Sequence, residues 1–413
     1  MEKMSSTAPF LSLWLDYSEP SSYYSNEMTI FRDAIHQFHE HRELHNAYPN
    51  LHAESVFKGL QRNSMNSYYK NIPFILSTGF YSGIQQYGGV ILSQSSSSWE
   101  GLQFVIKEAL SMSISGVSFV GSDIGGYYDM STLQVYLRWL QASTFLPLFR
   151  GYSEMHTFRK EPYMFKNNRE LVKYAFEIRN MFLRFWNSKF IECHINEVPV
   201  IRPLFYNFPD DENSLLIEGE WMVSTEILVS GVYDDSERCQ VYLPKGLWFN
   251  FFSDEIIQSN ASYIEMEIDY EFIPVFVRGG SVLVIGDRKC LTVEECFMKH
   301  NELHFYLGDD GNATTLFYAS CGEREGERIV RLELKGNQNT IEGRVQEIYT
   351  CEECKKVQLF VRKIVIHNMN TKPKHVHSKE VHIIQIKHFK NKKMVLYIKT
   401  FDAIQNFIIK FSY

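Results

Sequence analysis

The sequence lacks several features that would mark particular protein classes. No apolar run in the 413 residues approaches the roughly 20 residues that a membrane-spanning helix needs, so no membrane span is predicted. The formal charge is only −7 and the pI is about 6.1, so the whole chain offers no basic field for nucleic acid or anionic lipid. No internal repeat is present, which argues against solenoids and propellers.

Cysteine is scarce and irregularly placed. Seven cysteines, an odd number, lie scattered from Cys193 onward, so they predict no disulfide framework and leave the cellular compartment undecided. Cys351 and Cys354 have C-x-x-C spacing, but no second pair follows, and we interpret them as ordinary thiols. Four histidines at metal-like spacing have no carboxylate or cysteine to complete a site: His36, His39, His41 and His45. We therefore predict no metal and no cofactor.

The N-terminal segment also lacks the marks of a secretory signal. A short apolar stretch up to Leu15 runs directly into Asp16 and Glu19, without a small-residue cleavage site, and predicts a strand. Two glycosylation sequons, at Asn260 and Asn312, matter only if the chain enters the secretory pathway.

Short apolar strands alternate with amphipathic helices in the first half, the pattern of parallel βα units. The strand candidates cover residues 10–15, 73–76, 90–92, 117–120 and 198–201. A helix is expected after Ser98, which has the side chain of an N-cap, and another over residues 133–140. The longest predicted helix covers residues 170–187.

From about Ser214 the pattern changes to short β-branched and aromatic runs separated by turn residues, which predicts antiparallel β structure as far as Tyr413. We therefore expect three domains. Residues 1–212 would form an α/β domain, residues 213–288 a proximal β domain, and residues 289–413 a distal β-sandwich-like domain.

A carboxylate follows the first predicted strand, where a barrel presents its catalytic groups. Cleaving a glycosidic bond with retention needs a nucleophilic carboxylate and a second carboxyl group about 5 Å away. The segment from Trp14 to Ser21, with Asp16 at its centre, resembles the W-x-D-M-N-E-P-S nucleophile motif of glycoside hydrolase family 31.

Further segments follow in the order of that family. They are His41–Asn46, Ser98–Leu102, Gly116–Tyr127, Arg138–Gln141, Phe145–Arg150, Arg159–Pro162, Val200–Leu204, Tyr242–Trp248 and Ile273–Gly280. The resemblance covers nearly the whole chain and weakens after about Lys355. Within the family, the sequence is most similar to the catalytic subunit of glucosidase II and to neutral α-glucosidases. These trim glucose from N-linked glycans in the endoplasmic reticulum or act on small glucans.

The resemblance implies an α/β fold, with a partial (β/α)8 TIM barrel of C-terminal strands followed by two all-β domains. It implies a retaining α-glucosidase that needs no cofactor and acts on an α-glucoside or a glucosylated N-glycan. By family the location would be the endoplasmic reticulum lumen, although no signal peptide is recognised here. Asp16 would belong to the fourth barrel strand, so the first three strands are expected to be absent. Their exposed neighbours, about five parallel strands, would favour a partner chain that supplies the missing half, or a regulatory subunit.

Three sugar-contacting positions depart from the family pattern. The acid/base aspartate is replaced by Gln94, the substrate-contacting arginine by Thr78 and the active-site histidine by Tyr152. A carboxamide cannot exchange a proton near neutral pH, and general acid–base catalysis contributes roughly 10²- to 10⁴-fold. Asp16 and Asp123 remain, and Asp16 without its partners should carry a raised pKa or be solvated.

The remaining candidates have two interpretations each. Asp123 would contact substrate by family resemblance, or cap the turn at Gly125 and Gly126. Tyr17 and Trp139 would stack on a sugar ring, or belong to the core. The predicted function is accordingly an α-glucosidase-like protein with impaired catalysis. The alternatives are a non-catalytic glycan-binding or regulatory pseudoenzyme, and a non-functional gene fragment.

Overall fold

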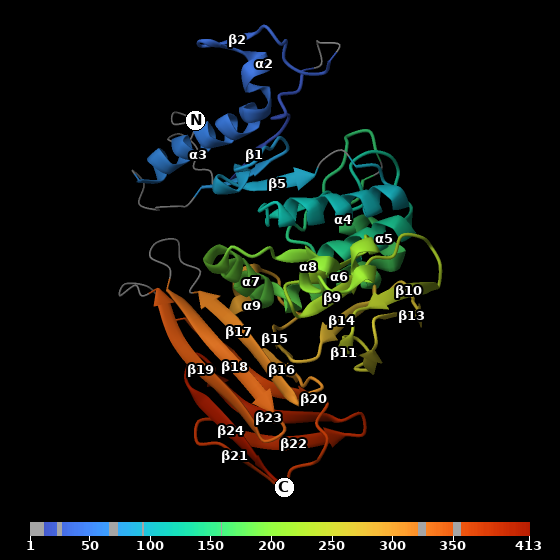
Figure 1. Cartoon of the computed structure of the whole chain (residues 1–413), viewed down its shortest axis with the longest axis vertical. Helices are drawn as coiled ribbons and strands as arrows, with labels where there is room; N and C mark the ends of the chain where they lie inside the picture. Colours follow the sequence, from blue (N-terminus) through green and yellow to red (C-terminus); the bar gives the residue numbers. More distant parts are fainter. Residues whose placement is uncertain are drawn as a thin grey trace.

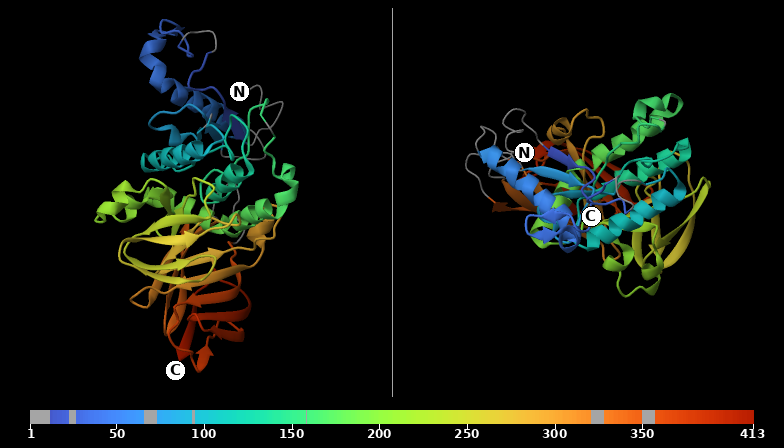
Figure 2. Two further views of the ribbon diagram at one scale, coloured as in Figure 1. Left: turned by 90° about the vertical axis from the view of Figure 1, so that its right-hand side faces the viewer. Right: turned by 90° about the horizontal axis from the view of Figure 1, so that it is seen from above.

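The computed structural model describes residues 12–22, 27–65, 73–92, 95–157, 159–320, 328–349 and 357–413. The chain is laid out in sequence order along its long axis (Figure 1), with the first helices at one end and the C-terminal sandwich at the other. Two perpendicular views show the same succession of parts (Figure 2). In the described residues, no helix has both the length and the apolar character needed to cross a membrane.

A parallel sheet forms the first part, in the order β1-β4-β5-β6. Its strands are β1 (Ser12–Leu15), β4 (Phe74–Ser77), β5 (Gly89–Leu92) and β6 (Val120–Ser122). Beyond β6, Asp123 makes a parallel bridge with Arg150, and the Leu148 N–H donates to the Val120 carbonyl over 3.2 Å. Residues 148–150 therefore occupy a fifth parallel position.

The main helices of this part are α3 (Tyr48–Met65), α4 (Trp99–Ile114), α5 (Leu133–Thr144), α6 (Arg169–Met181) and α7 (Leu183–Asn196). The predicted cap of α4 is confirmed, because Ser98 Oγ accepts the Gly101 N–H over 3.0 Å. Shorter elements are β2 (Ile35–His36), β3 (His39–Glu40), α2 (His41–Leu44), α8 (Leu204–Asn207) and five 3-10 turns: His45–Ala47, Ile84–Gln86, Pro162–Met164, Lys166–Asn168 and Glu212–Leu216.

Three sequence predictions for this part were wrong, and the first is the strand at residues 117–120, which is displaced to β6 (Val120–Ser122). The long helix predicted over residues 170–187 breaks at Phe182, where α6 ends and α7 begins. Phe182 is buried against the rings of Phe145 and Phe251, so packing overrides the helical pattern. The predicted strand at residues 198–201 is displaced to β7 (Ile201–Pro203) and pairs antiparallel with β8, which follows it closely in the chain.

The middle part is a six-stranded sheet in the order β12-β11-β14-β9-β8-β7, together with a separate ribbon of β10 and β13. The strands are β8 (Glu220–Val223), β9 (Ile227–Ser230), β10 (Arg238–Leu243), β11 (Gly246–Asn250), β12 (Ile256–Ser259), β13 (Ser262–Glu267) and β14 (Val275–Arg278). Trp221 and Trp248 are completely buried in it. Apolar residues of α4 to α7 join this sheet in one continuous core, so the first part does not end where the β structure begins.

The last part is a sandwich of two five-stranded sheets, β15-β16-β20-β23-β22 and β17-β18-β19-β24-β21. The bounds are β15 (Ser281–Ile285), α9 (Val293–Met298), β16 (Asn301–Tyr306), β17 (Asn312–Ser320), β18 (Ile329–Asn337), β19 (Thr340–Tyr349), β20 (Phe360–His367), β21 (His375–His377), β22 (Ile383–Phe389), β23 (Lys393–Asp402) and β24 (Phe407–Ser412). A disulfide joins Cys290 to Cys296. Cys351 and Cys354 lie outside the described residues.

Helix α7 of the first part forms hydrogen bonds with both β parts. Ser188 Oγ accepts the Tyr318 N–H of the sandwich over 2.8 Å. Lys189 Nζ lies 2.5 Å from Glu226 Oε1 and 2.9 Å from Glu192 Oε2. Burial alone would raise the pKa of Glu226, but the Lys189 ammonium reverses this and holds it below its usual value.

Candidate active site

Three predicted site residues follow the carboxyl ends of neighbouring parallel strands. Asp16 follows β1, Thr78 follows β4 and Asp123 follows β6. Because the strands are parallel, these residues lie at one edge of the sheet, the edge where barrel enzymes place their chemistry. Gln94, two residues beyond β5, lies outside the described residues.

Asp16 is exposed, and its carboxylate accepts the Tyr17 N–H over 3.1 Å at Oδ1. Partial burial raises the pKa of Asp16. The Tyr17 N–H and the positive charge of Arg150 lower it, and Glu19 raises it further. The sequence predicts that Asp16 carries a raised pKa or is solvated, and in the structure the residue is exposed while partial burial raises its pKa. Tyr17 itself is exposed and has a left-handed backbone, with φ of 52°.

Asp123 is the buried carboxyl group of the site, with 2% of its surface exposed. Burial raises its pKa to about 6. Arg150 and Lys160 lower that pKa, and the charge of Asp16 raises it. Arg150 Nε lies 3.3 Å from Asp123 Oδ1, yet the geometry does not make a hydrogen bond and this oxygen has no hydrogen-bond partner. A buried carboxylate oxygen without a hydrogen-bond partner can accept a hydrogen bond from a hydroxyl group of a ligand.

Arg150 is the centre of the arrangement and was not among the predicted site residues. Its guanidinium carbon lies 4.1 Å from the ring centroid of Trp14 and 4.7 Å from that of Tyr152. Both rings therefore stabilise the cation that interacts with the two carboxylates. Tyr152 also stacks on Tyr127 at 6.0 Å and keeps 44% of its surface exposed. The signal for Arg150 was present in the Phe145–Arg150 motif.

Thr78 and Trp139 support the site from below its surface. Thr78 is buried, its hydroxyl donates to the Leu15 carbonyl over 3.3 Å, and it accepts the Ser18 N–H over 3.4 Å. Trp139 has no exposed surface, and its ring N–H donates to Ser122 Oγ over 3.4 Å. Of the two interpretations of Trp139, core packing fits this position, since a fully buried ring has no face to offer a sugar.

Lys160 is a second residue that the predictions missed. Its ammonium donates to the Gly126 carbonyl over 2.8 Å and to Ser97 Oγ over 2.5 Å. Burial lowers the pKa of Lys160 to about 8. Gly125 and Gly126 have φ of 82° and 80°, so the loop after Asp123 uses backbone conformations that favour glycine. Lys160 thus fixes the loop that carries Asp123.

The described residues contain no group of three or more His, Cys, Asp or Glu side chains placed to hold a metal ion. His41 instead hydrogen-bonds to His36 over 3.0 Å and to His45 over 2.9 Å, while His39 pairs with Glu43.

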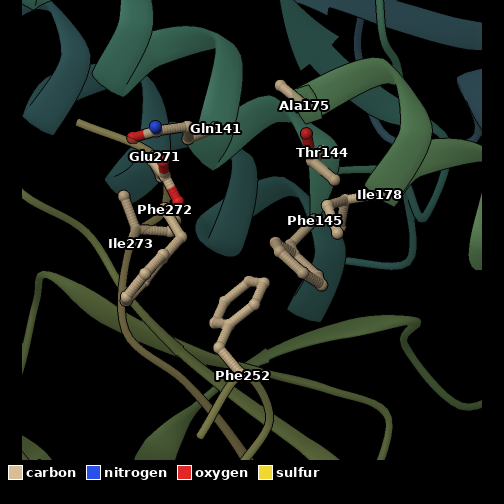
Figure 3. Close-up of a pocket in the computed structure, with 9 residues that line it drawn as sticks. All are labelled: Gln141, Thr144, Phe145, Ala175, Ile178, Phe252, Glu271, Phe272 and Ile273. Atoms are coloured by element: carbon tan, nitrogen blue, oxygen red, sulfur yellow. The ribbon is translucent and has the colours of Figure 1, made fainter. Parts of the chain in front are cut away.

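A small apolar pocket lies between α5, α6 and the loop at residues 271–273, away from the carboxylate pair (Figure 3). Phe252 points toward Phe145 across it. Beside it, Arg138 donates to the Phe272 carbonyl and Gln141 donates to the Tyr270 carbonyl. These bonds make the pocket part of the joint between the helices and the six-stranded sheet.

Carboxylates at the carboxyl edge of a parallel sheet, with β domains following, fit the arrangement expected of a glycoside hydrolase. Two family models give the same result. One for the family 31 TIM-barrel domain matches residues 1–189, and one for the family 31 C-terminal domain matches residues 197–283. Together they cover more than half of the chain. The chain therefore belongs to glycoside hydrolase family 31, and its relatives make it α-glucosidase-like.

Among the relatives, α-glucosidase 2 of Bacillus thermoamyloliquefaciens is 31% identical over 75% of this chain and 39% of its own length. Human neutral α-glucosidase C is 35% identical over 67% of this chain and 30% of its own. The crystal structure of a glucosidase II alpha subunit matches 97% of this chain and 46% of its own with a TM-score of 0.87 and 22% identity, which shows the fold. This chain thus spans about a third of the length of the curated relatives it matches.

Proposed function

We propose that this protein binds α-glucosides at the carboxyl edge of the parallel sheet and retains Asp16 as a nucleophile, but hydrolyses them poorly. The observation that supports the proposal is Arg150, which interacts electrostatically with both Asp16 and Asp123 and contacts the rings of Trp14 and Tyr152. An α-glucoside or a glucosylated N-glycan is the proposed ligand, by similarity to the relatives.

The impairment follows because a retaining mechanism needs a proton donor in its first step and a proton acceptor in its second. Asp16 would attack the anomeric carbon, and the bond from that carbon to the glycosidic oxygen would break. The leaving oxygen needs a proton, which Gln94 cannot give. In the second step water would attack the same carbon and must lose a proton, which Gln94 cannot take. Both steps should be slow for a natural glycoside.

An activated substrate separates the two steps. Fluoride leaves α-glucosyl fluoride without a proton, so glycosylation of Asp16 should proceed while deglycosylation stalls. Intact-mass spectrometry should then show one hexosyl group on the protein, and azide should release it as glucosyl azide, because an anionic nucleophile needs no base. The Asp16→Asn variant is the matched control and should remain unmodified. An unmodified parent protein would contradict the proposal.

A non-catalytic glycan-binding role is the second candidate, and Tyr152 favours it. Its side chain is 44% exposed next to Arg150 and Tyr127, and an exposed aromatic ring suits the apolar face of a pyranose. Calorimetry with an α-linked disaccharide should show saturable binding that the Tyr152→Ala variant weakens by about tenfold, the effect of losing one stacking contact. Binding together with an absent adduct would favour this role over the first.

We further propose that the parallel sheet is the C-terminal part of a (β/α)8 barrel. Five successive parallel positions support this, and within the described residues the outer edge of β1 has no paired strand. The proposed domains remain residues 1–212, 213–288 and 289–413. A partner chain could pair with β1. One solved neighbour is a heterodimer of the glucosidase II catalytic subunit with the binding domain of a regulatory subunit.

A further inference from the structure

The mild net charge of the chain conceals a strong separation of charge. Residues 357–413 contain ten lysines and one arginine against one aspartate and one glutamate, a formal charge of +9. Residues 213–288 contain thirteen acidic residues against four basic ones, a formal charge of −9. The first stretch belongs to the sandwich and the second to the middle part and β15, so the two charges lie in different regions of the chain (Figure 1).

The positive charge gathers at one edge of the sandwich, which we call the basic edge. Strands β21 and β22 are the outermost strands of the two sheets, and only residues 378–382 connect them, so both border the same edge. Exposed lysines on and around them are Lys372, Lys374, Lys379, Lys387, Lys390 and Lys392. In the described part of the chain, none of these six forms an ion pair, whereas Lys363 and Lys393 are paired with Glu302 and Asp254.

The basic edge also presents unpaired main chain and apolar side chains. Among the described strands, β22 pairs with β23 alone. Ile384 is 65% exposed and Phe389 is 44% exposed on it. Lysines on edge strands commonly prevent association. Exposed isoleucine and phenylalanine on the same strand have the opposite effect, and together with lysine they suit an acidic strand as a partner.

A strand of that kind exists in the same chain. The ribbon of β10 and β13 and its flanking loops, which we call the acidic ribbon, has six exposed acidic residues: Asp234, Asp235, Glu237, Glu265, Glu267 and Asp269. Arg238, which pairs with Glu267, is the one cation on the two strands. Strand β13 pairs with β10 alone among the described strands, and Tyr263 on it is 57% exposed.

We propose that the acidic ribbon of one copy of this protein docks on the basic edge of a second copy. Lys387 and Phe389 share the outer face of β22. Tyr263, Glu265 and Glu267 share the outer face of β13, so each strand presents charged and aromatic side chains on one face. Pairing of β13 with β22 would satisfy both open edges and place glutamates against lysines. The two surfaces differ, so the contact is heterologous and leaves one of each free on the dimer.

Sedimentation velocity of the full chain tests this proposal. Association should be clear at about 0.1 M salt and weaken by about tenfold or more at about 1 M salt, where the Debye length falls from about 10 to about 3 Å. The triple variant Lys387→Glu, Lys390→Glu, Lys392→Glu should be monomeric. The double variant Glu265→Lys, Glu267→Lys should be monomeric as well.

Mixing these two variants gives the decisive result. In the triple variant the basic edge has become acidic, and in the double variant the acidic ribbon has become basic. These two altered surfaces are complementary, so the mixture should form a heterodimer although neither variant self-associates. Reversal of exposed cations elsewhere, with Lys166→Glu and Arg169→Glu, should leave the parent association unchanged. A monomeric parent at low salt, or a mixture that stays monomeric, would overturn the proposal. Retention on heparin without self-association would overturn it too, and would assign the basic edge to a polyanionic partner.

Discussion

Glu220 gives the sharpest test of the energetics of the β structure. It lies on β8, 5% exposed, where Oε1 accepts the Tyr242 N–H over 2.8 Å and Oε2 has no hydrogen-bond partner. Burial raises its pKa to about 8, and the hydrogen bonds from Tyr242 and Ser230 lower it only in part. In the folded protein this carboxyl group is therefore protonated at neutral pH.

The sign of the effect follows from proton linkage. Between the ordinary glutamate pKa of 4.5 and about 8, the folded state keeps a proton that the unfolded state has released, so the free energy of unfolding falls as the pH rises. Each unit of pKa difference is worth about 1.4 kcal/mol, so the loss between pH 5 and pH 8 is on the order of 3 to 4 kcal/mol. The Glu220→Gln variant cannot titrate and should not show this loss.

Urea unfolding at several pH values, followed by tryptophan fluorescence, measures the difference between parent and variant. Trp221 and Trp248 are fully buried in the same sheet as Glu220 and report its unfolding. The Glu237→Gln variant, with its change at an exposed carboxylate, is the matched control and should follow the parent. Parallel stability profiles for Glu220→Gln and the parent across this pH range would refute the reasoning.

Three further effects should be measurable. Lys189→Met leaves Glu226 buried without its cation and should cost about 3 to 5 kcal/mol in urea unfolding, while adding Glu226→Gln should recover part of it. Ser98→Ala removes the cap of α4 and should cost about 1 kcal/mol, with Ser115→Ala at the other end as a smaller control. Affinity for a cationic iminosugar should rise as the pH passes through about 6, where Asp123 ionises, and Asp123→Asn should abolish the rise.

Local patterns in the sequence predicted the parts of the fold that depend on neighbours in the chain. The strands at β4 and β5, the cap at Ser98 and the change to β structure after about Ser214 follow from periodicity and side-chain chemistry. The placement of Asp16 and Asp123 could be predicted from the sequence for the same reason. Each follows a parallel strand, and parallel strands end at a common edge.

Features that depend on residues far apart in the chain could not be predicted from the sequence. The break at Phe182 requires Phe251, about seventy residues further on, and the antiparallel pairing of β7 requires β8. The contacts of Arg150 with the rings of Trp14 and Tyr152 join residues from opposite ends of the parallel sheet. Charge separation was visible in the sequence, but only the fold places the lysines on two adjacent edge strands.

Tyr152 contributes to the electrostatics of the candidate site through its aromatic ring. Its ring, with that of Trp14, provides π faces that hold Arg150 near the carboxylates, and this interaction needs no proton. Arg150 in turn offsets the cost of burying Asp123, whose pKa would otherwise lie further above its usual value. Replacing Tyr152 with alanine should therefore weaken more than a sugar contact. With one face of Arg150 exposed to solvent, the ion pair with Asp123 loosens, the pKa of Asp123 rises above about 6, and the pH at which iminosugar binding improves shifts upward. Tyr152→Phe keeps the ring and should leave that pH unchanged, whereas an equal shift in both variants would show that the hydroxyl group, and not the π face, sets the charge of the site.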